Sequence, residues 1–330
     1  MKTRMFVTFI WVVFLFFLLI SFSPNSSFAA EKKYPTRSID LFCGFGPGGP
    51  TDLLTRAVAR GLEKYIGVTV VPGNKPGAGS MVAATALANS QPDGYTMALL
   101  TLEHFVQPIL YGRATYSLED IRVVGRAATY GQVIAVNADL PWKTFQEFLD
   151  HVRKNPGVKF GHPGVGTTTY LRMENLNRFA NMKMVGVPFK SDPEMLAGCL
   201  GGHVPAMVSA LTNIKSQADA GKLRVLFSFE LSAREGLDPS VADLPTVFGD
   251  RVGDFDVSQN LVVPAKTPIE IVEILERNLE KVTKDPEYIS EVRKLYLIPN
   301  FVDGNTIMKK ILPERVIRLK EVMMYTGLLK

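Results

Sequence analysis

The sequence predicts an α/β fold in which two halves of the chain each build a mostly parallel sheet flanked by helices. Three observations lead to this prediction. Strand-like apolar runs alternate with helical patterns from residue 39 to residue 101. The same alternation returns between residues 158 and 229, although the two halves do not repeat in sequence. Glycine-rich turns follow several of these strands, and ligands of such sheets bind beyond the carboxyl ends of the strands.

The first 29 residues have the layout of a cleaved secretory signal peptide. Lys2 and Arg4 precede an apolar block at 5–20, and small residues surround the expected cleavage point before Ala30. An uncleaved membrane anchor is the alternative, because the apolar block approaches spanning length. The polar stretch at 21–27 favours cleavage, so we expect an exported protein.

Composition limits the classes of function. A chain of 330 residues with 46% hydrophobic residues can bury a large core and form two domains. Loss of Lys2 and Arg4 with the signal peptide leaves 35 of the 37 basic residues against 32 acidic ones, a formal net charge of +3. That charge is too small and too dispersed to indicate a nucleic-acid partner. With four histidines, two cysteines and no HxxxH or CxxC spacing, we expect no metal site.

Residues 39–52 carry the clearest local signal. An apolar strand pattern at 39–45 runs into a glycine-rich turn, after which Pro50 suits the first turn of a helix. Unpaired amides at that helix start and the positive end of the helix dipole favour an anion. The turn glycines, which permit positive φ or close approach of a bound group, are Gly44, Gly46, Gly48 and Gly49. The sequence therefore predicts an anion-binding turn.

The remaining elements follow from periodicity and turn residues. In the first half we expect a helix to 65, a strand at 68–71, a second glycine-rich turn at 72–80, a helix at 81–89 and a strand at 95–101. A long strand pattern at 123–137, interrupted by Gly131, suits a crossing between domains. In the second half we expect a helix capped by Thr144, strands at 158–161, 184–189, 204–210 and 223–229, a loop at 162–169 that opens a helix, and a helix at 193–200.

The C-terminal part is expected to return to the first sheet. Residues 256–264 have the pattern of a second crossing, and 268–282 form a strongly amphipathic helix. Residues 305–328 are helical in pattern, with Pro313 expected to bend or break the helix. We expect these helices to add no strand and to pack on the first sheet. The predicted domains are residues 30–130 with 255–330, and residues 131–254.

The two cysteines leave two alternatives open. Cys43 lies in a strand pattern and Cys199 in a helix pattern, each among apolar neighbours. An exported protein could pair them in a disulfide. Two buried free thiols are the simpler expectation, because unpaired cysteines are among the most buried residues.

Short motifs in a shared order run along nearly the whole chain after the signal peptide. They lie at 45–52 (FGPGGPTD), 74–79 (NKPGAG), 92–96 (PDGYT), 164–167 (GVGT), 187–190 (VPFK), 200–202 (LGG), 221–224 (GKLR), 244–247 (LPTV) and 264–268 (PAKTP). Through them the chain resembles the exported solute receptors of tripartite tricarboxylate transporters, the Bug receptors. The resemblance implies a monomeric two-lobed periplasmic binding protein, a type 2-like Venus flytrap without cofactor, that captures a small carboxylate. It also implies delivery to the membrane permease subunits of a tripartite transporter.

The resemblance further implies a set of ligand contacts, made largely by backbone amides and ordered water. From the first lobe these are Phe45, Gly46, Gly48, Thr51, Asp52, Ala78, Gly79 and Thr101, and from the second lobe Gly164, Gly166, Thr167, Thr168 and Ser209. Four positions depart from the family's pattern. His162 stands where a small residue is usual, Tyr170 where histidine is frequent, Pro205 where aspartate is common, and Gly44 where proline is frequent.

Several of these residues have a second interpretation. Asp52 either contacts the ligand through water or caps its helix. His162 is a candidate titrating ligand residue, with a hydrogen bond to its own loop as the alternative. Lys75 and Lys190 are expected to be solvated charges at the rim of the site.

The sequence also offers partial matches to two classes of enzyme, dinucleotide-binding oxidoreductases and serine hydrolases. Gly44, Gly46 and Gly49 fit a dinucleotide fingerprint, but the second strand ends at Asn74 without the acid that such a site needs. No G-x-S-x-G motif marks a catalytic serine, so we expect no enzyme. The alternatives to a transport receptor are an exported enzyme that uses the same cleft and a ligand-presenting partner of a membrane sensor.

Overall fold

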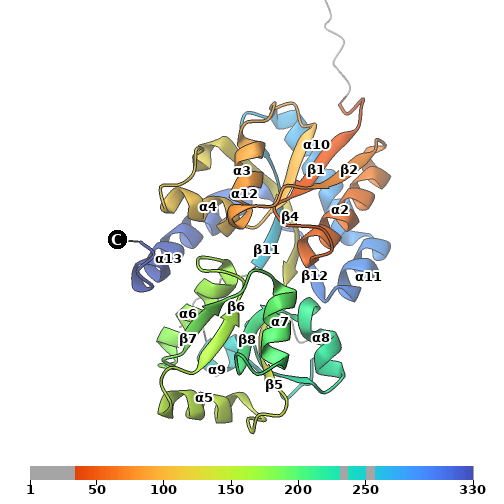
Figure 1. Ribbon diagram of the computed structural model, residues 1–330. Coiled ribbons are helices and arrows are strands. Elements are labelled where there is room, and N and C mark those ends of the chain that lie inside the picture. Colours follow the sequence, from red (N-terminus) through yellow and green to blue (C-terminus); the bar gives the residue numbers. More distant parts are fainter. Residues whose placement is uncertain (1–33, 231–236, 250–256, 330) are drawn as a thin grey trace, which may run out of the picture. The chain divides into compact units, whose positions relative to one another are not determined.

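The computed structural model describes residues 34–230, 237–249 and 257–329, and within them the strands form two six-stranded mixed sheets (Figure 1). The predicted signal peptide, residues 1–29, lies outside these ranges. Among the helices of the described ranges, none has both the length and the apolar character needed to cross a bilayer.

The first sheet has the strand order β12-β4-β11-β3-β1-β2. Its strands are β1 (Ile39–Cys43), β2 (Val70–Asn74), β3 (Thr96–Leu100), β4 (Ile121–Tyr130), β11 (Val257–Pro264) and β12 (Leu297–Pro299). β1 pairs in parallel with β2 and β3, whereas β11 runs antiparallel to β3 and β4. Because β1, β2 and β3 point the same way, the turns that follow them lie at one edge of the sheet.

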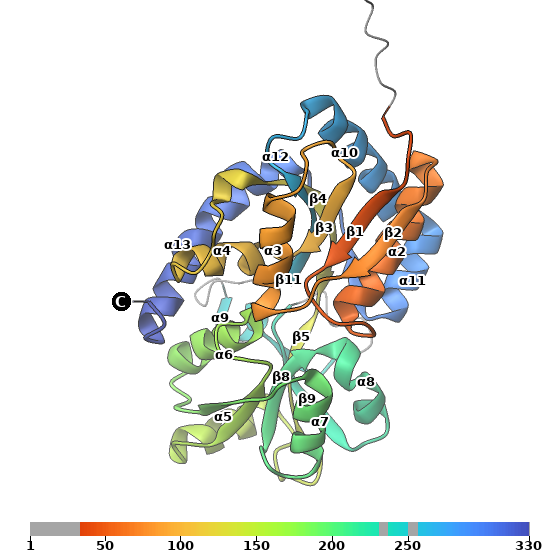
Figure 2. The same cartoon turned by 45° about the horizontal axis from the view of Figure 1, so that its top comes forward.

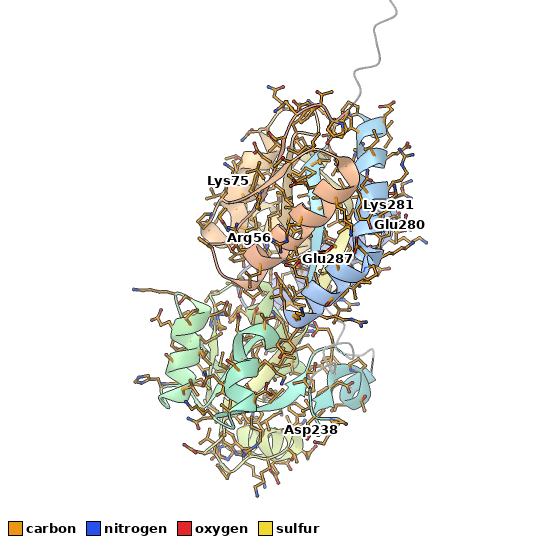
Figure 3. The ribbon with its side chains drawn as sticks, turned by 90° about the vertical axis from the view of Figure 1, so that its right-hand side faces the viewer. Arg56, Lys75, Asp238, Glu280, Lys281 and Glu287 are labelled. Atoms are coloured by element: carbon orange, nitrogen blue, oxygen red, sulfur yellow. The ribbon has the colours of Figure 1, made fainter. Side chains whose placement is uncertain are left out.

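Helices cover both faces of this sheet (Figures 1 and 2). On one side lie α2 (Pro50–Ile66), α10 (Ile269–Lys284) and α11 (Pro286–Lys294), and on the other α3 (Met81–Ala88), α4 (Leu102–Leu110) and α13 (Leu312–Tyr325). α2 and α10 approach closely, since a Cβ at Gly61 would lie 2.5 Å from Val282 Cγ1. Half-buried Glu280 and exposed Lys281 lie on the outer side of α10 (Figure 3).

The C-terminal region confirms one expectation and corrects another. α10 packs on α2 and β4, so the last helices do return to the first sheet. The expectation that they add no strand is wrong, because β12 pairs antiparallel with β4. The short helix α12 (Gly304–Thr306) leads into a π-helical turn at Ile307–Ile311, and Pro313 stands in the first turn of α13. The helical conformation thus continues through Pro313, with a π-helical turn just before it, and the predicted break at the proline does not occur.

The second sheet has the strand order β10-β9-β5-β8-β6-β7. Its strands are β5 (Gln132–Asn137), β6 (Lys159–His162), β7 (Val185–Pro188), β8 (Ala206–Ala210), β9 (Leu223–Ser228) and β10 (Ala242–Asp243). The helices of this part of the chain are α5 (Phe145–Lys154), α6 (Thr168–Phe179), α7 (Asp192–Leu200), α8 (Leu211–Asp219) and α9 (Leu244–Phe248). β5 is antiparallel to both of its neighbours, while β6 is parallel to β7 and β8. Thr144 caps α5 in a capping box with Glu147, which confirms the predicted helix start.

The chain passes from the first sheet to the second at Gly131, between the end of β4 and the start of β5. This is the position at which the sequence pattern broke. β11 brings the chain back to the first sheet from Val257 onward, and residues 250–256 lie outside the described ranges. The first sheet is thus built from segments before residue 131 and after residue 256.

Both cysteines are buried free thiols. Burial raises the pKa of the Cys43 thiol and raises that of Cys199 to about 11. Both groups therefore stay protonated at neutral pH, and the simpler of the two sequence-based alternatives is confirmed.

Candidate ligand-binding site

The turn after β1 leaves several backbone amides without a protein acceptor. Gly49 is the N-cap of α2 and has no side chain with which to cap it, and Pro50 follows at the first helical position. The amides of Thr51 and Asp52 belong to the first helical turn, where no intrahelical acceptor exists. Within the described ranges, no acceptor is found for the amide of Gly46, whereas the hydrogen-bonded turn at residues 47–48 directs the amide of Gly49 toward Gly46 O. These donors lie at the positive end of the helix dipole and can bind an anion.

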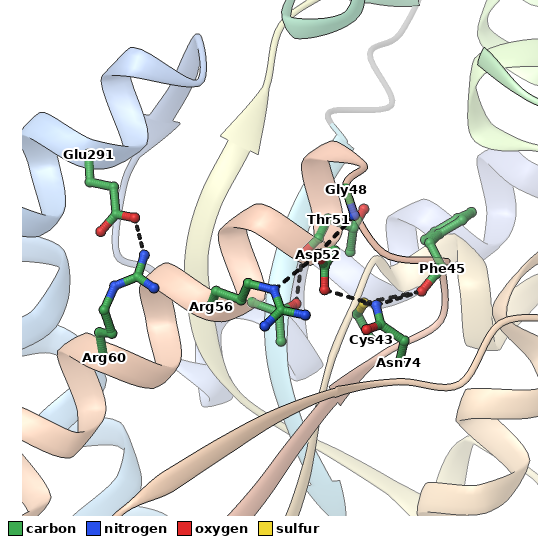
Figure 4. A network of polar contacts seen from close by, with 10 residues as sticks. Cys43, Phe45, Gly48, Thr51, Asp52, Arg56, Arg60, Asn74 and Glu291 are labelled. Atoms are coloured by element: carbon green, nitrogen blue, oxygen red, sulfur yellow. Dashed lines mark hydrogen bonds and ion pairs between the residues drawn. The ribbon is translucent and has the colours of Figure 1, made fainter. Parts of the chain in front are cut away.

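Asp52 holds this turn in shape. Its carboxylate is almost fully buried and accepts hydrogen bonds from Gly48 N at 3.0 Å, Arg56 Nε at 3.1 Å and Asn74 Nδ2 at 2.9 Å (Figure 4). Burial alone would raise the pKa of Asp52, but these hydrogen bonds outweigh it and lower the pKa. The Gly48 amide is already used by Asp52. The carboxylate therefore acts on the turn itself, close to the capping role that the sequence left open.

The second glycine-rich turn packs against the first. Asn74 Nδ2 donates to Phe45 O at 2.9 Å, and Ser80 Oγ donates to Gly44 O at 3.3 Å. A Cβ at Gly44 would lie 2.2 Å from Ser80 Oγ, so position 44 requires glycine here. This contact gives a physical reason for one departure from the family's pattern. Ala78 and Gly79, both exposed, have positive φ of 46° and 61°.

The turn after β3 also packs against the turn after β1. Thr101 is fully buried and caps α4, where its Oγ1 accepts from His104 N at 3.3 Å and its amide donates to His104 Nδ1 at 3.4 Å. The ring of Phe45, 37% exposed, packs edge-on against His104 with centroids 5.0 Å apart. Desolvation lowers the pKa of His104 to about 4, so the imidazole is neutral at pH 7. The structure thus brings the turns after β1, β2 and β3 together.

In the second sheet, the loop after β6 is fixed by its own hydrogen bonds. Gly164 N donates to His162 Nδ1 at 3.2 Å, and Thr167 Oγ1 accepts from Tyr170 N at 3.3 Å to cap α6. His162 is 1% exposed, and burial lowers its pKa, which leaves the ring neutral. The arrangement matches the alternative in which His162 bonds to its own loop. Gly166 has a φ of +83°, and a Cβ there would lie 2.6 Å from the hydroxyl of Tyr111 on the loop after α4.

The last two predicted ligand contacts are the hydroxyls of Thr168 and Ser209. Thr168 is buried, and its Oγ1 has no hydrogen-bond partner within the described ranges, so it is available to a ligand or water. Ser209, at the end of β8, donates to Asp192 Oδ1 at 3.4 Å and accepts from Asn213 Nδ2 at 3.0 Å.

Tyr130 connects the two groups of turns. Its hydroxyl shares a hydrogen bond of 2.7 Å with Thr51 Oγ1 in the first turn of α2. Burial raises the pKa of this phenol, and the charge of Asp192 adds to the rise. Val133, three residues after Tyr130, pairs with Ser209 in the second sheet, so the segment 130–133 joins Thr51 of the first sheet to Ser209 of the second. The sequence alone singled out neither Tyr130 nor Asp192 as part of the site.

The two lysines predicted to be solvated charges are exposed. Lys75 and Lys190 are both exposed, and Figure 3 shows Lys75 on the same side of the molecule as Arg56. Within the described ranges, no group of three or more histidine, cysteine, aspartate or glutamate side chains could hold a metal ion.

Comparison with known proteins identifies the family. Residues 54–328 match the model of the tripartite tricarboxylate transporter family receptor. A protein of Cupriavidus necator, described as a UPF0065 protein in the gbd 5' region, is 31% identical over 304 residues, which cover 92% of this chain and 91% of the relative.

Two solved structures show the fold. The periplasmic binding protein BugD is 24% identical with a TM-score of 0.76, covering 89% of this chain and 99% of its own. Rpa4515 of R. palustris, solved with adipate, is 23% identical with a TM-score of 0.76, covering 89% of this chain and 98% of its own. The predicted fold class, a two-lobed periplasmic binding protein with helices around each sheet, is confirmed. The chain belongs to the receptor family of the tripartite tricarboxylate transporters, a family of periplasmic solute-binding proteins.

Proposed function

We propose that this protein is an extracytoplasmic receptor that captures a small carboxylate and delivers it to the permease subunits of a tripartite transporter. The observation that carries the proposal is the turn after β1, where the amides of Gly46, Thr51 and Asp52 have no acceptor among the described residues and stand at the start of a long helix. Such a turn replaces the water around a carboxylate without any cationic side chain. The adipate found with Rpa4515 supports a carboxylate as the class of ligand.

Capture takes place between two lobes in this proposal. Residues 30–130 with 255–330 form one lobe, residues 131–254 form the other, and the chain bends at its two crossings. Ligand favours the closed state because both lobes contact it only when they are shut. The predicted contacts named above supply amides from the first lobe and hydroxyls such as Thr168 from the second. The mature protein starts after a cleaved signal peptide and acts as a monomer without cofactor.

Calorimetric titration of the mature protein with mono-, di- and tricarboxylates tests the proposal, together with a pair of variants at Gly49. This residue has φ −80° and ψ 167°, which proline also adopts. Gly49→Pro removes the amide N–H, whereas Gly49→Ala keeps it and meets no atom closer than 4.0 Å. A hydrogen bond to a charged group contributes about 1.5–3 kcal/mol, so Gly49→Pro should weaken the Kd by roughly 10- to 150-fold.

Two results would contradict the proposal. The first is the absence of binding by any carboxylate combined with turnover of a substrate, which would favour an exported enzyme. The second is equal affinity of the two Gly49 variants, which would remove the turn from the site. Ligand-dependent binding to a membrane sensor domain, in place of transport, would change the partner and leave the receptor function intact.

A further inference from the structure

Asp192 is an acid without a basic partner inside the candidate site. It is the first residue of α7, half-buried, and its carboxylate accepts a hydrogen bond from Ser209 of β8, to which Asn213 of α8 donates in turn. Within the described ranges, no lysine, arginine or histidine forms an ion pair with it. Burial raises the pKa of Asp192, so its ionised form is costly without a cationic partner. A carboxylate held only by neutral groups leaves a local negative charge that a ligand can neutralise.

The start of α7 offers little to an anionic ligand group. Ser191 Oγ accepts the Glu194 amide at 3.3 Å, and Ser191 O accepts the Met195 amide at 3.0 Å. Pro193 has no amide proton. Among the described residues, the donors left in this turn are the amide and hydroxyl of Ser191 and the amide of Asp192, which lies beside its own carboxylate. A second carboxylate of a ligand would therefore meet like charge here with few donors to offset it.

The acid and the anion-binding turn belong to one connected site. Asp192 is bound to Ser209 of β8, which pairs with Val133 of β5, three residues after Tyr130; the Tyr130 hydroxyl binds Thr51 in the first turn of α2. Its partner Ser209 is one of the predicted ligand contacts. The site therefore has an end that favours negative charge, at the start of α2, and an end that favours positive charge, at Asp192.

On the basis of the function proposed above, we infer that Asp192 is a specificity residue that binds a protonated amine. The solute is then an amino-carboxylate with its amine at the end opposite to its carboxylate. The carboxylate occupies the amides at the start of α2, and the ammonium group donates to Asp192. A dicarboxylate of the same length binds less well, because its second carboxylate faces Asp192.

The test compares ligands in which an ammonium group replaces one carboxylate of a dicarboxylate. The pairs are β-alanine with succinate, 4-aminobutyrate with glutarate, and 5-aminovalerate with adipate. Each is titrated into the mature wild-type protein, into Asp192→Asn and into Glu194→Gln, which removes one exposed negative charge from the same helix. Thermal unfolding of the three proteins checks that Asp192→Asn leaves the fold intact, and Asp192→Ser serves as a second variant.

We expect at least one amino-carboxylate to bind ten times more tightly than its dicarboxylate partner. Asp192→Asn should remove this preference, and Glu194→Gln should keep it. Lowering the pH should weaken amino-carboxylate binding to the wild type as Asp192 takes up a proton. Burial raises the pKa of Tyr130 at the end of β4, so this phenol stays neutral over the range and adds no competing charge.

The possible failures are distinct. Tighter binding of the dicarboxylates, or an unchanged ratio in Asp192→Asn, would overturn the role of Asp192 and leave the carboxylate receptor standing. Stronger dicarboxylate binding at low pH, lost in Asp192→Asn, would show that Asp192 acts as a neutral acid that donates to a second carboxylate. Lack of binding by every ligand in both series would overturn the proposed carboxylate function, and this inference with it.

Discussion

The contact between Gly44 and Ser80 joins two turns of the candidate site, and a single methyl group should disrupt it. In Gly44→Ala the new Cβ would lie 2.2 Å from Ser80 Oγ, 2.3 Å from Ser80 Cβ and 2.9 Å from Ser80 Cα. The last of these atoms is backbone, so rotation of the Ser80 side chain cannot relieve the clash. Overpacking of this kind costs about 1–3 kcal/mol. We expect a loss of about 2 kcal/mol of stability and weaker carboxylate binding, because both turns must shift.

Gly46→Ala is the matched control for this substitution. Position 46 lies in the same turn, but a Cβ there meets no atom within 4 Å, and its φ lies outside the left-handed region. Chemical denaturation of the two variants measures the difference in unfolding free energy. Ser80→Gly in the Gly44→Ala background should recover part of the loss, and the coupling is obtained from the double-mutant cycle. Equal stability of Gly44→Ala and Gly46→Ala would refute the reasoning, whether or not a ligand is known.

Three further predictions rest on single contacts. Gly166→Ala should lower thermal stability, since φ is +83° and the Cβ would lie 2.6 Å from the Tyr111 hydroxyl, and Tyr111→Phe should restore part of the loss. Hydrogen bonds from Lys64 and Tyr65 lower the pKa of Asp285 from 3.8 to about 2. The stability that Asp285 contributes should therefore be complete above about pH 4 and lost as the pH falls toward 2, so Asp285→Asn and wild type should converge there in denaturation experiments. A thiol reagent should modify Cys43 and Cys199 only after unfolding, and rapid modification of the native protein would contradict their burial.

Local signals in the sequence were enough for most elements. Thr144 was recognised as a cap because it directly precedes the helical pattern of Phe145, Phe148 and Leu149. Gly131 interrupted a strand pattern that does divide between β4 and β5. The sequence did not predict β12, because a strand of three residues shows no periodicity. The sequence did not predict α4 either, because Pro108 stands inside this helix and its helical pattern directly follows the apolar run of β3.

The sequence predicted the part of the candidate site that is formed by residues close together in the chain, and missed the contacts between residues far apart in the chain. The anion-binding turn lies within residues 39–52, so glycine and proline spacing alone indicated it. Asp192 meets Ser209 from 17 residues away, and Thr51 meets Tyr130 from 79 residues away. Only the order of the strands brings these pairs together. His162 was a reasonable titrating candidate by position, but its burial and its bond to Gly164 follow from packing that no local pattern encodes.

The residues on either side of Gly131 are each anchored to a different part of the candidate site. Tyr130 binds Thr51 in the first turn of α2. On the other side, Gln132 Nε2 donates to Thr169 Oγ1 at 2.7 Å, close to the start of α6, and the backbone amide of Gln132 donates to Glu230 at 2.8 Å. In the proposed closing motion, rotation at this crossing would move the turn after β1 with Tyr130 and the loop before α6 with Gln132. A bend at one glycine is then coupled directly to the separation of the two groups that hold the ligand.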